Sequence, residues 1–80
     1  MTAKLLCVGL HATDDQTLAA LPFVTALGAK SGGIDVEIAL VGEAVYLMKD
    51  EVARSVHGVG FPPLSELLEK TISAEIPIWI

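Results

Sequence analysis

The sequence predicts an α/β domain built around a mostly parallel sheet. Three apolar segments, at residues 5–10, 34–41 and 76–80, are separated by segments with the features of helices. A run that is apolar throughout, such as 5–10, is typical of a parallel strand covered on both faces. Strands that alternate with helices along the chain favour parallel pairing through right-handed crossovers. We therefore expect strands buried on both faces, three of them visible in this chain.

The first segment, Leu5 to Leu10, is a strand followed by a helix start. Thr13 and Gln16 have the spacing of a capping box, in which each side chain bonds the other residue's backbone N–H. Pro22 then predicts either a kink or a main helix that begins near Leu21, because proline removes a hydrogen bond inside a helix. Glycines 32 and 33 predict the end of this helix.

The second strand is predicted over residues 34–41, where apolar side chains alternate with others. Its first half carries Asp35 and Glu37 on the alternate face, which favours a place toward an edge of the sheet. Gly42 turns the chain, and we expect a helix over 44–48 and a second short one over about 50–56.

The last third of the chain is predicted as a loop, a helix and a strand. Residues 57–63 form the loop, with two prolines at its end that suit the first turn of a helix. The helix then shows one apolar face. That face comprises Leu64, Leu67, Leu68 and Ile72. Residues 76–80 form the third strand, with Pro77 near its start.

We interpret residues 1–80 as one domain that needs a partner. A chain of 80 residues is marginal by itself, and Cys7, its only cysteine, excludes an internal disulfide. The composition is 52% hydrophobic and only 19% charged, so self-association is the simplest way to cover its surface. The third predicted strand ends at Ile80 where another crossover is expected, so either further residues follow or a neighbouring subunit covers the gap.

Charge and spacing exclude several classes of function. Five scattered Lys and Arg residues and a net charge of −5 argue against binding to nucleic acid or to an anionic membrane. Cys7, His11 and His57 lack the close spacing of zinc ligands, so we expect no metal and no cofactor. The sequence shows neither a secretory signal nor a stretch of about 20 apolar residues, which predicts the cytoplasm.

The candidate site lies where the carboxyl ends of parallel strands meet. His11, Thr13 and Asp14 follow the first strand, while Glu43 and Tyr46 follow the second. His11 has the chemistry of a general acid or base, or of an anion-orienting group. A loop histidine, a helix cap, a solvated glutamate and a packing tyrosine explain the same residues without a ligand. These five are therefore candidate ligand-binding residues, and we assign no catalytic residue.

Cys7 lies in the middle of the first strand between apolar neighbours. A thiol in such a place is a small buried hydrophobe with a raised pKa and low reactivity. Glycine-rich phosphate loops, serine elbows and helical metal motifs do not occur in the sequence. We expect Cys7 to be structural.

Three stretches in succession resemble the DsrE/DsrF-like family of sulfur-relay proteins. They are Leu21-Pro-Phe-Val-Thr-Ala26, Val41-Gly-Glu-Ala-Val-Tyr-Leu-Met-Lys49 and Gly60-Phe-Pro-Pro-Leu-Ser-Glu-Leu-Leu68. The resemblance spans nearly all of the chain and implies a three-layer α/β/α domain, assembled as a homotrimer or homohexamer. Active members carry a persulfide on a cysteine just after the strand that matches Ile76 to Ile80, and this sequence stops there.

The resemblance implies a DsrE-like protein in a persulfide relay, with other sulfur-relay proteins as partners and with the sulfur-carrying cysteine absent from these 80 residues. Two alternatives stay open. In the first alternative the chain is a non-catalytic oligomeric subunit. In the second it is an α/β module that binds a small ligand or anion.

Overall fold

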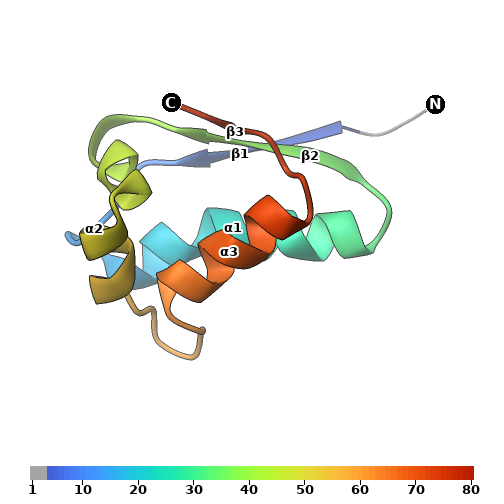
Figure 1. Ribbon diagram of the computed structural model, residues 1–80. Helices are drawn as coiled ribbons and strands as arrows, with labels where there is room; N and C mark the ends of the chain where they lie inside the picture. Colours follow the sequence, from blue (N-terminus) through green and yellow to red (C-terminus); the bar gives the residue numbers. More distant parts are fainter. Residues whose placement is uncertain (1–3) are drawn as a thin grey trace.

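The computed structural model describes residues 4–80 and confirms a small α/β fold with a parallel three-stranded sheet (Figure 1). The elements are, in chain order, β1 (Lys4–Gly9), α1 (Gln16–Ser31), β2 (Asp35–Leu40), the 3₁₀ helix η1 (Gly42–Met48), α2 (Asp50–Ser55), α3 (Leu64–Ser73) and β3 (Ile78–Trp79). The order of helices and strands follows the sequence pattern. The third strand is shorter than predicted.

The sheet has the order β1-β2-β3, so β2 is its central strand. Both neighbours are parallel to β2, with Ile38 in register with Cys7 on one side and with Ile78 on the other. The expectation that the second strand lies toward an edge is therefore wrong. Its polar residue Glu37 is compatible with the central position because Lys4 and Trp79, from the two flanking strands, both bind its carboxylate.

All the helices lie on the same side of the sheet (Figure 1). The expectation that the strands are covered on both faces is wrong for β1, where Leu6 and Val8 are 58% and 51% exposed. Within residues 4–80 the chain thus has two layers, helices on a sheet. We call the uncovered side of the sheet the open face.

The hydrophobic core lies between the sheet and the helices. Val36, Ile38 and Leu40 of β2 point into it, and Phe23 of α1 is fully buried against it. Gly9 lets α1 approach β1 closely, since a Cβ atom on Gly9 would lie 2.9 Å from Leu40 Cδ2 and 3.4 Å from Pro22 Cγ. The three β2 side chains show the alternation that the sequence predicted.

The start of α1 differs from the predicted capping box. Asp15 is the N-cap, and its carboxylate accepts a hydrogen bond from the Leu18 N–H at 3.0 Å. The side chain of Gln16 does not bond to the helix start. Its carbonyl oxygen accepts a hydrogen bond from the N–H of His57, 41 positions further along the chain. Pro22 lies inside a continuous helix that is not divided into two segments.

The buried face of α3 contains Thr71 in place of Ile72. Thr71 is fully buried, and its hydroxyl donates to the Leu67 carbonyl at 2.8 Å. At 100° per residue, Thr71 lies about 20° around the helix from Leu64, whereas Ile72 lies about 80° away. Ile72 is exposed and Leu68 is only partly buried. The prediction assigned Ile72 to the buried face because it is more apolar than its neighbour Thr71, although Thr71 is the residue that faces the core.

Candidate functional site

The carboxyl ends of β1 and β2 bring two loops to one edge of the sheet. Gly9 and Leu40 are in register at the end of the ladder, and the Val41 N–H still donates to the Gly9 carbonyl at 3.0 Å. Gly42 then turns the chain with a φ of +60°, a conformation that suits glycine. The predicted site residues therefore leave from neighbouring strands, as expected.

His11 and Asp14 form a pair in the loop after β1. The His11 Nδ1 lies 2.7 Å from Asp14 Oδ2, while Asp14 Oδ1 accepts from the N–H of Ala12 at 2.7 Å. The bond with His11, followed by the bond with Ala12, lowers the pKa of the Asp14 carboxyl below its ordinary value. The carboxylate holds a proton on Nδ1, so in the neutral ring Nε2 is the proton acceptor.

The other three predicted residues do not join this pair. Thr13 and Glu43 are exposed. Tyr46 is exposed as well, and the ammonium group of Lys49 lies 5.9 Å from the centre of its ring. The structure thus brings together two of the five predicted residues, His11 and Asp14.

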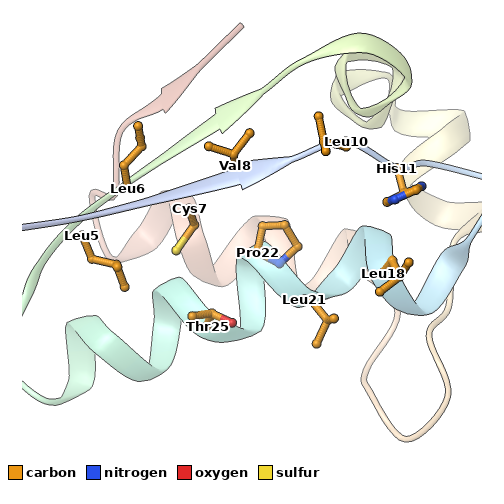
Figure 2. A pocket seen from close by; sticks show the side chains of 10 residues that line it. All are labelled: Leu5, Leu6, Cys7, Val8, Leu10, His11, Leu18, Leu21, Pro22 and Thr25. Carbon is orange, nitrogen blue, oxygen red and sulfur yellow. The ribbon is translucent and has the colours of Figure 1, made fainter.

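A groove that the sequence analysis missed runs between β1 and α1 (Figure 2). Its volume is about 420 Å³. Leu5 and Cys7 point down from β1 toward α1, while Leu6 and Val8 point away from the helix. The lining residues are Leu5, Leu6, Cys7, Val8, Leu10, His11, Leu18, Leu21, Pro22 and Thr25. The only signal in the sequence was the spacing of Leu18, Leu21, Pro22 and Thr25, which puts them on one side of a helix.

Cys7 lies in the wall of this groove and is buried, as predicted. Its side chain points toward α1 and the residue is 9% exposed. Burial raises the pKa of the Cys7 thiol above its ordinary value, so the reactive thiolate is scarce at neutral pH. Nothing in these surroundings activates it as a nucleophile.

The open face combines apolar side chains with one polar cluster. Leu6, Val8 and Trp79 are exposed on it, and Ala39 lies in register with both Val8 and Trp79. Glu37 accepts from the Trp79 indole N–H at 2.7 Å and forms an ion pair with Lys4. The bond with Lys4, then that with Trp79, lowers the pKa of Glu37, and the same ion pair raises the pKa of Lys4.

Residues 4–80 contain no group of three His, Cys, Asp or Glu side chains placed to hold a metal ion. No helix among these residues is both long and apolar enough to cross a membrane. Every buried side-chain nitrogen and oxygen in the same part of the chain has a hydrogen-bond partner.

Residues 4–80 therefore define a small α/β domain with an apolar groove, a histidine–aspartate pair near one end of it and an open sheet face. Comparison of the chain with protein-family models, with curated proteins and with solved structures found no match.

Proposed function

We propose that this chain is a DsrE-like protein of a persulfide relay and that residues 1–80 do not include the sulfur-carrying cysteine of the family. The observation that carries the proposal is the position of Cys7. The only thiol of the chain is buried under α1 and its pKa is raised, so it is poorly suited to attack a persulfide donor. A role in the relay then depends on contacts with other subunits.

The open face supports a role through contacts. Monomeric proteins rarely expose contiguous apolar patches of more than a few hundred Å². Leu6, Val8 and Trp79 alone leave more than half of their surface exposed on this face. We propose that helices of a cysteine-carrying relay protein cover it, which would complete the three-layer α/β/α arrangement. The assembly would act in the cytoplasm, as a homotrimer or homohexamer of this chain with its relay partners.

Two measurements test this function. After incubation with glutathione persulfide, intact-mass analysis should show no added sulfur on the native protein. Gain of one sulfur atom that is lost in Cys7→Ser would contradict the proposal. Native mass spectrometry with a DsrE-like protein that carries the family cysteine should then show a mixed oligomer. A mixture that stays as separate species at high micromolar concentration would contradict the relay context.

A second function, binding of a small ligand, is favoured by the position of His11. The histidine lines the groove, so an apolar ligand in the groove would meet the imidazole at one end. Sites for small molecules are typically apolar with a few polar groups that fix orientation. Ligand-observed NMR with a fragment set of short aliphatic carboxylates and alcohols tests this. Binding that His11→Ala abolishes and Thr13→Ala leaves intact is expected, and no binding by any fragment would contradict it.

A further inference from the structure

The outer edge of β1 has unpaired backbone groups. The strand order places β2 on one side of β1, and no strand among residues 4–80 lies on the other. The carbonyl of Gly9 points toward β2, because it accepts from the N–H of Val41. Backbone groups alternate in direction along a strand. The N–H and C=O groups of Leu6 and Val8 therefore point outward, where a further strand would bind.

This edge lacks the usual protection against strand pairing. Natural edge strands are blocked by prolines, bulges or charged residues, lysine above all. Residues 5–10 contain neither a proline nor a charged residue, and β1 pairs with β2 without a bulge. The only charge on the strand is Lys4 at its start, and Glu37 holds it. The edge is thus open to an added strand over five or six residues.

The groove beside this edge is free of charge as well. None of its ten lining residues is Asp, Glu, Lys or Arg, although the chain has 15 such residues and a net charge of −5. Two copies of so acidic a chain repel each other wherever their charged surfaces meet. The groove is a surface on which a second copy can approach closely without bringing carboxylates together.

We propose that two copies of this chain pair through the outer edges of their β1 strands, antiparallel and about a two-fold axis. The register centred on Cys7 aligns the uncharged residues 5–9 of the two copies and places Leu6 opposite Val8 of the second copy. These are the residues whose N–H and C=O groups point outward, so each pair forms two hydrogen bonds. The product is a continuous six-stranded sheet, in which a two-fold axis uses the same surface of both copies.

The α1 helices add a second contact to this dimer. Leu18, Leu21 and Thr25 line the groove below β1, so the two-fold axis brings the same side of α1 from each copy together. One edge pairing with one helix contact is a small interface, which we place near the lower limit of specific interfaces, about 600 Å² per copy. We therefore expect a dissociation constant of about 1–100 μM, the range of weak specific contacts.

This inference does not depend on a sulfur-relay function. It narrows the expected assembly: a hexamer with two-fold axes has room for the β1 dimer, whereas a trimer with only a three-fold axis cannot contain it. An external peptide added to the same edge is the competing occupant. In that case the protein alone would stay monomeric.

Sedimentation equilibrium of the native chain is the first test. The mass should rise with concentration from 8.4 kDa toward twice that value. Thr25→Glu places a carboxylate in the groove at an exposed helical position, and the two-fold axis would bring two such groups together. We expect its dissociation constant to rise at least tenfold. Ile72→Glu is the matched control, an exposed residue on α3 outside the groove, and should dimerise as the native chain does.

Hydrogen exchange identifies which surface is used. The amides of Leu6 and Val8 should exchange more slowly as the native protein is concentrated, while in Thr25→Glu the same slowing should require at least tenfold higher concentration. Circular dichroism establishes whether each variant is folded. If Thr25→Glu does not fold, Leu21→Glu serves as a second variant with a carboxylate in the groove. A mass of 8.4 kDa up to millimolar concentration would overturn the proposal. A dimer that Thr25→Glu leaves intact, or one whose Leu6 and Val8 amides remain unprotected, would also overturn it.

Discussion

The two faces of the sheet differ sharply although the same strands form both. On the side of the helices, Val36 and Ile38 of β2 are 4% and 0% exposed. On the open face, Leu6 and Trp79 are 58% and 60% exposed, and the central strand carries Glu37 between them. The covered face is a complete core, whereas the open face has the composition of a core without its second layer.

The difference shows that burial in this chain is decided by the position of helices rather than by the apolar character of a residue. Leu5, Leu6 and Leu10 are as apolar as Leu40, yet only Leu40 is fully buried. An apolar side chain contributes to stability in proportion to the area that folding removes from water. The covered face should therefore provide most of the stability of the monomer, and the open face should be available for association.

Truncation of the same residue type on the two faces gives the largest expected difference. Val36→Ala removes two methyl groups from the core and should lower the free energy of unfolding by about 2–3 kcal/mol. Val8→Ala makes the same change on the open face, at a position that is 51% exposed, and should cost less than about 1 kcal/mol. Urea unfolding at low micromolar concentration measures both. Equal effects would mean that a second layer covers the open face in solution.

Gly9 tests how closely the helix layer packs on the covered face. Gly9→Ala would put a methyl group within 2.9 Å of Cδ2 of Leu40, a side chain that is itself fully buried, and should cost about 1–2 kcal/mol. Gly28→Ala adds a methyl group inside α1 where nothing lies within 4 Å. That change should stabilise the protein by about 0.5–1 kcal/mol. Thermal unfolding should shift in opposite directions, and a shift in the same direction would contradict this packing.

The polar cluster of the open face predicts a pH dependence. Because Lys4 and Trp79 hold the pKa of Glu37 below its ordinary value of 4.5, the stabilisation is fully present above that pH. It is lost as the pH falls through the pKa of the folded state. Glu37→Gln should therefore be less stable than the native chain at pH 7, and the difference should shrink as the pH falls through the lowered pKa of Glu37.

Urea midpoints of both proteins, measured at pH 7 and at a series of lower pH values, test this effect. Glu69→Gln, which removes a carboxylate from α3, is the control and should not show the convergence. A constant difference between Glu37→Gln and the native chain across this range would mean that the ion pair and the indole bond contribute nothing in solution.

The rate at which a reagent labels the Cys7 thiol reports how tightly the covered face is closed. This is the smallest of the expected effects. The burial and raised pKa of Cys7 predict that a thiol reagent labels the native protein far more slowly than the protein unfolded in urea. The rate should rise in Gly9→Ala if that change loosens the contact between β1 and α1. Rapid stoichiometric labelling of the native chain would show that the groove opens readily.

The sequence determined the order of the elements, because hydrophobic periodicity and capping residues act within a few positions of each other. The alternation over 34–41 correctly gave the side chains of β2 that point into the core. The exact cap did not follow, since Asp15 and Thr13 are both good N-cap residues and the contact of Gln16 with His57, 41 positions away, selects between them. Of the candidate site, His11 and Asp14 were predictable as neighbours because they share one short loop.

The tertiary structure alone decided which faces and edges of the sheet are covered. An apolar run such as 5–10 is equally compatible with one covered face or two, because periodicity reports the character of side chains and not the number of layers around them. The central place of β2 was also hidden, since Glu37 acquires its partners only when Lys4 and Trp79 arrive from both sides. The groove between β1 and α1 exists for the same reason: the two elements are separated in sequence, and crossover geometry sets them side by side.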